Sequence, residues 1–261
     1  MQFFDSHCHF DFAVFDSDRD LMWRECHALG IAHLIIPGVS IAQWPLAASI
    51  SQQYKNIYFG VGVHPWWINS DKDIVQYLET IRRAVLQSIS QQNCVTIGEC
   101  GLDAVIEMPM QLQQQVLDIH LQLAQQTSKP LIIHCRKAHN ELLVQLKRYD
   151  LPAGGVIHGF SGSYELAASY WDVGFRLGIG GTITYDRANK TRAAVKKLPL
   201  EAILLETDAP DMPLSGKQGA RNSPLQIIDI AQTLADLRGE PLEKIAAQTS
   251  LNSRTLFKID Y

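Results

Sequence analysis

The sequence predicts a parallel (β/α)8 barrel, the TIM-barrel class of α/β folds, on three observations. The chain has 261 residues, close to the roughly 250 that one such barrel needs. Eight short runs rich in apolar and β-branched residues recur along it, and longer segments with helical apolar spacing lie between them. The hydrophobic fraction is 46%, and the sequence contains no linker or low-complexity stretch. We therefore predict a single domain over residues 1–261.

The predicted strands follow one another at intervals that leave room for a helix after each. They cover residues 2–10, 33–39, 57–64, 94–100, 130–135, 154–160, 175–181 and 202–208. The clearest helical spacing of apolar residues falls at 40–54, 73–90 and 110–127. This alternation favours a closed parallel barrel over an open doubly wound sheet.

Composition and charge exclude several classes of protein. Lys and Arg number 23 against 27 for Asp and Glu, so the net charge is −4 and no global positive field attracts nucleic acid or anionic membrane. The first residues lack the pattern of a signal peptide, and no apolar stretch is long enough to cross a bilayer. The five cysteines, without C-x-x-C spacing, predict no disulfide framework. We expect a reduced, cytoplasmic protein of enzyme size, with no membrane and no obligate protein partner.

The first strand carries two histidines separated by one residue, in the stretch DSHCHFDF at 5–12. On a strand, His7 and His9 point to one face and Cys8 to the other. Two imidazoles on one face are a pattern found at metal sites. A lone H-x-H is more often a pair of satisfied or exposed histidines, so the rest of the chain decides.

Further polar side chains lie at the carboxyl ends of the other predicted strands. With the first two histidines they form the set His7, His9, His64, Glu99, His134, His158 and Asp208. The carboxyl ends of barrel strands form the face that holds active sites. Burying ionisable groups there is costly unless something pairs them, and divalent cations pair them all. Without His64, the set provides two metal positions with one carboxylate between them.

Each of these residues also has an ordinary structural interpretation. His134 or His158 alone fits a core histidine, Glu99 half of a buried ion pair, and Asp208 a helix cap. These interpretations do not explain why all of them stand at equivalent strand ends. His64, which precedes Pro65, is predicted to contact substrate, with support of neighbouring residues or simple packing as the alternative.

Three cysteines adjoin the predicted ligands. Strand alternation turns Cys8, Cys100 and Cys135 away from the barrel axis, where a thiol packs as a small hydrophobe. We exclude them as ligands. The remaining nitrogen and oxygen donors suit two divalent ions per chain and allow Zn²⁺, Mn²⁺ or Mg²⁺.

The ordered motifs resemble those of a known family. DSHCHFD, GECGLD, PLIIHCR, GVIHGFSG and LLETDAP, followed by RNSP at 221–224, are similar to the successive signatures of the TatD family of metal-dependent deoxyribonucleases. HGFSGS, GGTITY and ETDAPDMPL most resemble its YjjV branch. The resemblance implies a barrel of the amidohydrolase superfamily, two divalent metals and hydrolysis of phosphoester bonds.

The resemblance also implies residue roles. It places His7 and His9 on one metal, His134 and His158 on the other, Glu99 between them, and Asp208 beside the attacking water. Glu99 and Asp208 would then be catalytic as well as ligands.

Two positions depart from the commoner pattern of the family. Ala104 follows GLD, and Asp211 follows TDAP, where aromatic residues are frequent. Both departures remove stacking surfaces for a base, and a carboxylate at 211 facing the site would repel a polyanion. The resemblance therefore supports the metal chemistry more strongly than it supports DNA as the substrate.

Chemical roles follow from these residue types. Asp208 can orient a water and accept its proton. Arg136 lies two residues beyond His134, where a guanidinium can grip a phosphate oxygen, with a surface arginine as the equal alternative.

Three hypotheses for function remain open. The first is a two-metal phosphoesterase, a TatD-type deoxyribonuclease that uses a metal-activated water. The second is an amidohydrolase acting on a C–N or carboxylic ester bond of a small molecule, because the same metals polarise a carbonyl. Many enzymes of that superfamily use a carboxylated lysine between the metals, so Glu99 favours the first hypothesis. The third is a binding protein that keeps the pocket without catalysis, and the complete ligand set argues against it.

Overall fold

The computed structural model describes residues 1–69 and 73–259. Its strands form one eight-stranded sheet whose spatial order follows the chain from β1 to β8. The strands are β1 (Phe3–Asp5), β2 (Ile31–Ile36), β3 (Ile57–Val61), β4 (Cys94–Asp103), β5 (Leu131–Arg136), β6 (Gly155–Ile157), β7 (Phe175–Ile179) and β8 (Ile203–Leu205). The predicted (β/α)8 barrel is therefore confirmed as the fold class.

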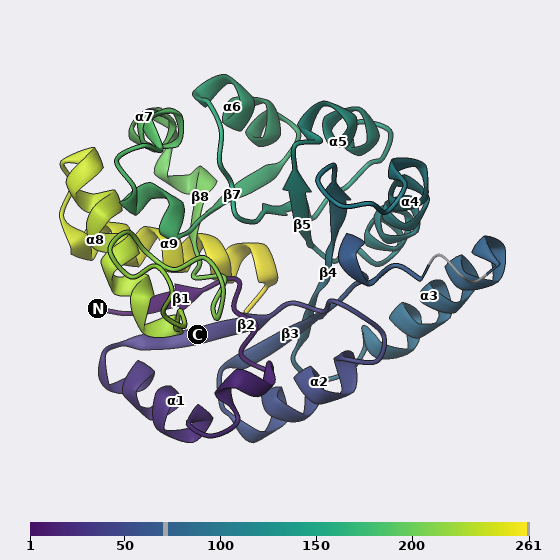
Figure 1. Ribbon diagram of the computed structural model, residues 1–261, viewed down its shortest axis with the longest axis horizontal. Helices are drawn as coiled ribbons and strands as arrows, with labels where there is room; N and C mark the ends of the chain where they lie inside the picture. Colours follow the sequence, from purple (N-terminus) through teal and green to yellow (C-terminus); the bar gives the residue numbers. More distant parts are fainter. Residues whose placement is uncertain (70–72, 260–261) are drawn as a thin grey trace. The chain divides into compact units, whose positions relative to one another are not determined.

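Helices alternate with these strands along the chain (Figure 1). They are α1 (Arg19–Ala28), α2 (Trp44–Gln53), α3 (Ile74–Ser88), α4 (Met110–Thr127), α5 (His139–Leu146), α6 (Tyr164–Asp172), α7 (Asn189–Lys197), α8 (Ile227–Arg238) and α9 (Leu242–Phe257). Short 3-10 turns are η1 (Ala13–Phe15), η2 (Pro65–Trp67), η3 (Gly181–Thr184), η4 (Leu200–Ala202) and η5 (Pro224–Gln226). The three helices with the clearest predicted spacing all form, and α4 has the predicted bounds.

The chain divides into two compact units, which we call the first and the second unit. The first unit comprises residues 1–36 together with those from 158 onward, and the second comprises 37–157. In the second unit β3, β4, β5 and β6 pair in parallel. Apolar side chains of these strands, such as Ile97 and Leu131, are fully buried.

In the first unit β1 pairs with β2 and β7 pairs with β8, each in parallel. Backbone bonds also join the ends of β8 and β1. The amide of Ser6 donates to the carbonyl of Leu205 at 3.0 Å, and that of Asp208 donates to the carbonyl of His7 at 2.9 Å. The first and last strands of the chain therefore hold each other in register, as closure of the sheet requires.

Several strands end earlier than the sequence predicted. β1 ends at Asp5, so His7 and His9 lie in the connection that follows and not in the strand. The reason is local, because the Asp5 carboxylate accepts from the amide of His7 at 3.3 Å and from the amide of Thr207 at 3.0 Å. A side chain thus satisfies a backbone donor that a longer strand would have paired with its neighbour.

The other predicted ligands divide between strands and the residues just after them. Glu99 and His134 lie within β4 and β5, while His64, His158 and Asp208 follow β3, β6 and β8. Active-site residues of barrels come from these two locations, strand ends and the loops after them. Among the described residues, no helix combines the length and the apolar character that crossing a membrane requires.

Candidate metal centre

In the first unit, two histidines converge on one carboxylate. Oδ1 of Asp208 lies 3.4 Å from Nε2 of His7 and 3.5 Å from Nε2 of His9. One ligand atom from each of the three residues lies within 4.8 Å of the others. His7 is fully buried and His9 is 8% exposed. Imidazole nitrogens and a carboxylate oxygen at this spacing form a donor set that fits a divalent cation.

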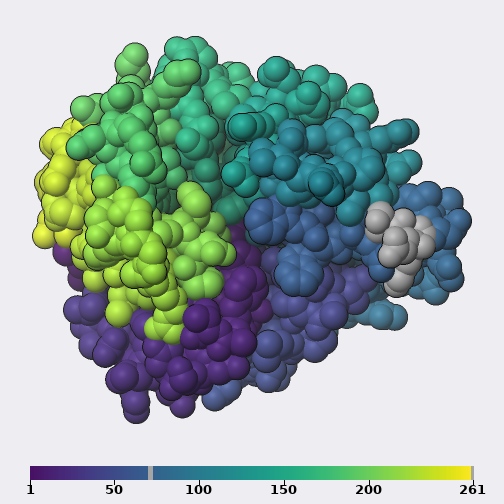
Figure 2. Space-filling view, in the orientation of Figure 1, coloured from purple at the N-terminus to yellow at the C-terminus, as the bar shows by residue number. Residues whose placement is uncertain are grey.

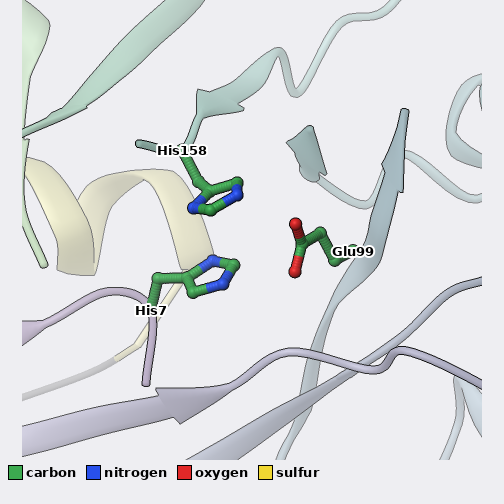
Figure 3. A group of neighbouring side chains, drawn as sticks. All are labelled: His7, Glu99 and His158. Carbon is green, nitrogen blue, oxygen red and sulfur yellow. The ribbon is translucent and has the colours of Figure 1, made fainter. Parts of the chain in front are cut away.

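His158 joins this group through its ring. The rings of His7 and His158 stack with centroids 3.9 Å apart and planes 10° from parallel, and Figure 3 shows them face to face. On the other edge of the His158 ring, Nδ1 lies 3.6 Å from Oε1 of the buried Glu206. That carboxylate is held by a hydrogen bond from the amide of Gly159. Glu206 therefore faces Nδ1 of His158 and not Nε2.

Asp208 has an unusual backbone conformation and a lowered pKa. Its φ of 56° is in the left-handed region, which Asp tolerates better than most residues and which often marks functional sites. Burial raises the pKa of Asp208, but hydrogen bonding with His9 and the charges of His158 and His7 outweigh burial, so the pKa is lowered. The loop that follows leads to α8, and its residues 215–221 are exposed at the yellow-green front of Figure 2.

In the second unit, Glu99 is the centre of a cluster with two histidines. Its Oε1 lies 3.2 Å from Nδ1 of His134 and 3.4 Å from Nε2 of His64, and the side chain is 2% exposed. Ligand atoms of these three residues also lie within 4.8 Å of one another. Figure 3 shows the carboxylate of Glu99 projecting from β4.

Glycine allows β4 to pass close to β5 beside this cluster. Gly101 has a φ of 153°, and a Cβ placed there would lie 1.9 Å from the carbonyl oxygen of His134. Any side chain at 101 would force the two strands apart. The glycine therefore fixes the distance between the strands that carry Glu99 and His134.

A second buried carboxylate, that of Asp103, contacts His134 of this cluster. Oδ2 of Asp103, at the end of β4, lies 3.2 Å from Nε2 of His134 and accepts from the indole Nε1 of Trp66 at 2.9 Å. Burial raises the pKa of Asp103, but the hydrogen bonds with His134 and Trp66 outweigh burial and hold the pKa well below its usual range. His64 is held in turn, because its Nδ1 accepts from the amide of Trp66 at 3.1 Å.

The structure also places the predicted substrate contact Arg136 and two of the cysteines excluded as ligands. Arg136 ends β5 and its side chain is exposed. Cys8 and Cys100 are buried, and their sulfurs face the carbonyls of Ala209 and Ile132. Burial raises the pKa of both thiols, which keeps them protonated and unsuited to bind a metal.

Sequence reasoning did not identify Asp103, Glu206 or Trp66. The first two carried a usable signal, because Asp103 shares strand parity with Glu99, and Glu206 lies two residues before Asp208. Trp66 carried none, since its role depends on a hydrogen bond to a residue 37 positions away.

Known proteins share sequence similarity with this chain over almost its whole length. The family model described as TatD related DNase matches residues 4–258. The chain is 39% identical to the uncharacterized metal-dependent hydrolase YjjV of Escherichia coli K12, over 99% of this chain and 98% of that protein. It is 31% identical to the 3'-5' ssDNA/RNA exonuclease TatD of Salmonella typhimurium, over 94% of this chain and 95% of that protein.

A solved structure gives the same answer for the fold. The crystal structure of YjjV from Escherichia coli matches with a TM-score of 0.91, covering 99% of this chain and 98% of that chain. The likeness thus extends over the elements that carry both clusters. The chain belongs to the TatD family of metal-dependent hydrolases.

Proposed function

We propose that this hydrolase cleaves phosphoester bonds with two divalent metal ions and a carboxylate on β4. The observation that carries the proposal is Glu99, a buried glutamate 3.2 Å from Nδ1 of His134. A glutamate at this strand is the feature that favours phosphoester chemistry over the amidohydrolases that use a carboxylated lysine. The relative named as an ssDNA/RNA exonuclease, at 31% identity, supports the same reaction class.

The proposed ligands are those that the resemblance to the family implies. His7 and His9 would bind one ion, His134 and His158 would bind the other, and Glu99 would be a ligand to both. In support, Nε2 of His7 and Nε2 of His9 lie within 3.5 Å of Oδ1 of Asp208, and Nδ1 of His134 lies 3.2 Å from Oε1 of Glu99. Zn²⁺, Mn²⁺ and Mg²⁺ all remain candidates, since the donor set combines nitrogen and oxygen atoms.

When bound, such ions lower the pKa of water and neutralise charge on phosphoryl oxygens. The chain itself supplies the proton acceptor, and we assign this role to Asp208. Its carboxylate lies beside His7 and His9 and is ionised at neutral pH, so that it can hydrogen-bond a water and take its proton. Arg136, exposed at the end of β5, is the proposed contact for a substrate phosphate.

Exposed tryptophans favour a substrate that carries a planar ring. Trp66 and Trp67 are 61% and 54% exposed, and the ring of Trp66 lies 5.8 Å from that of His64. Neither Ala104 nor Asp211 offers a stacking surface, whereas the indole of Trp66 is an aromatic surface next to this cluster. We therefore propose a nucleotide or the end of a single strand as the substrate.

A parallel assay tests the proposal. The metal-loaded protein is given a chromogenic phosphodiester, single-stranded DNA, RNA and a panel of amides and carboxylic esters. We expect turnover of the phosphodiester and of at least one nucleic acid, and little turnover of the amides. Turnover confined to amides or carboxylic esters would replace the proposal with the amidohydrolase hypothesis.

A further inference from the structure

Asp103 is fully buried at the end of β4 and makes three directional contacts through its carboxylate. Oδ1 accepts from the amide of Val105 at 2.9 Å. Oδ2 accepts from Nε1 of Trp66 at 2.9 Å and lies 3.2 Å from Nε2 of His134. Each oxygen thus has a defined partner, so the carboxylate cannot rotate without losing hydrogen bonds.

These contacts determine which nitrogen of His134 carries the proton. An indole N–H only donates and an ionised carboxylate only accepts, so Oδ2 acts as an acceptor. A neutral imidazole has one N–H, and Nδ1 of His134 faces a second carboxylate oxygen, Oε1 of Glu99, at 3.2 Å. If Nδ1 is the nitrogen that binds a metal beside Glu99, the proton must be on Nε2, where Oδ2 of Asp103 accepts it.

We propose that Asp103 is a positioning residue that holds the proton of His134 on Nε2 and so presents Nδ1 as the metal-binding nitrogen. Trp66 fixes the carboxylate in this orientation. The inference rests on the proposed metal site for its consequence, but the arrangement of Asp103 and His134 is a property of the metal-free chain. Carboxylates in this relation to a ligand histidine typically raise metal affinity 10–100-fold.

Long-range 1H–15N spectra of the imidazole rings test the proposal directly. The signals of His134 are those absent from His134→Gln. At pH 8 we expect Nε2 of His134 to carry a proton both without metal and with Zn²⁺. The nitrogen whose shift changes on adding Zn²⁺ should be Nδ1.

A second histidine, His120, provides an internal reference because its contacts fix the opposite tautomer. His120 is fully buried, its Nε2 accepts from the amide of Val63 at 3.1 Å, and its Nδ1 lies 2.7 Å from the carbonyl of Val116. His120 should therefore carry its proton on Nδ1 in every sample. A change at His120 would mean that a variant has disturbed the fold.

Two variants, Trp66→Phe and the same variant combined with Asp103→Asn, test the role of the Asp103 carboxylate. Trp66→Phe removes one donor to Oδ2, but the amide of Val105 still holds Oδ1, so the tautomer of His134 and the Zn²⁺ affinity should change less than in the double variant. Adding Asp103→Asn lets the amide oxygen accept from Val105 while its NH2 group faces Nε2 of His134. We expect Nε2 to lose its proton in the double variant and the Zn²⁺ affinity to fall by roughly 10–100-fold.

Two results would overturn the proposal. One is a wild-type spectrum in which Nε2 lacks a proton or responds to Zn²⁺ as the bound atom. The other is a folded double variant with Nε2 still protonated and unchanged affinity. If the double variant does not fold, the wild-type spectra decide alone. If Zn²⁺ does not bind, the proposed function fails, while the metal-free spectrum still tests the contact between Asp103 and His134.

Discussion

Asp208 combines two possible roles, metal ligand and proton acceptor, and substitution separates them. Asp208→Asn keeps the size of the side chain but removes the basic carboxylate. Loss of a general base should lower kcat by roughly 100-fold or more, with only a modest loss of bound metal, because histidines remain as ligands. Initial rates measured beside elemental analysis of the purified protein check this.

The matched control is Asp211→Asn in the same loop. Asp211 is exposed, and its amide donates to the carbonyl of Asp208 at 2.9 Å, so the backbone contact survives the change. This variant should keep its bound metal and at least the activity of the wild type, because removing the charge can only lessen repulsion of an anionic substrate. If Asp208→Asn loses metal in proportion to activity, Asp208 is chiefly a ligand. If the variant stays fully active, Asp208 has neither role.

In the proposed site, metal binding beside His134 depends on Glu99. Glu99→Gln keeps the shape of the side chain but removes the negative charge between two histidines. We expect the bound metal to fall and turnover to fall with it by roughly 10-fold or more. Glu107→Gln, at an exposed position after the same strand, is the control and should behave as the wild type. Normal metal content and activity in Glu99→Gln would exclude Glu99 from the site.

At the scale of elements, His120 ties α4 to the residues that follow β3. Burial lowers the pKa of His120 to about 4, from an ordinary value of 6.5. The folded state therefore stays neutral while the unfolded chain gains a proton as the pH falls below 6.5. The stability that this histidine contributes is complete above pH 6.5 and is lost between pH 6.5 and about 4.

His120→Gln should remove this pH dependence, because Gln keeps a donor and an acceptor but does not titrate. Between pH 7.5 and 5 the free energy of unfolding of the wild type should fall by about 2 kcal/mol more than that of the variant. Urea unfolding in the presence of chelator measures both, and the other buried histidines cancel in the difference. Equal pH dependence of the two proteins would show that His120 is not held neutral.

Elements were predictable where one pattern acts over many residues. The apolar spacing at 110–127 continues for five turns, and α4 has those bounds. β1 was predicted too long because its end depends on hydrogen bonds that Asp5 accepts from Thr207, 202 positions away in the sequence. The same limit applies to Asp103 and Trp66, whose contact is created by the fold.

At the scale of the whole molecule, stability comes from apolar strands and the helices that pack on them. Strand residues such as Ile35, Ile133 and Leu177 are fully buried. Removing divalent metal should therefore abolish turnover and leave the secondary structure in place. Circular dichroism before and after chelation checks this, and wholesale loss of helical signal would mean that the metals are structural, as in small zinc domains.

The site as a whole was predictable in its residue types but not in its geometry. Strand ends indicated the histidines, Glu99 and Asp208, because a barrel brings these ends to one face. Which ring nitrogen faces which carboxylate was not predictable. It depends on contacts such as that between His158 and Glu206, at 3.6 Å, which follow from the register of distant strands.

Turnover of a phosphodiester measured against the number of metal ions bound per chain tests the central claim most directly. Metal-free protein is titrated with Zn²⁺ or Mn²⁺, and bound metal and initial rate are determined on the same samples. The proposed site predicts no turnover without metal and a rate that reaches its plateau at about two ions per chain. Full phosphodiesterase activity in chelated protein, or none at any metal content, would contradict it.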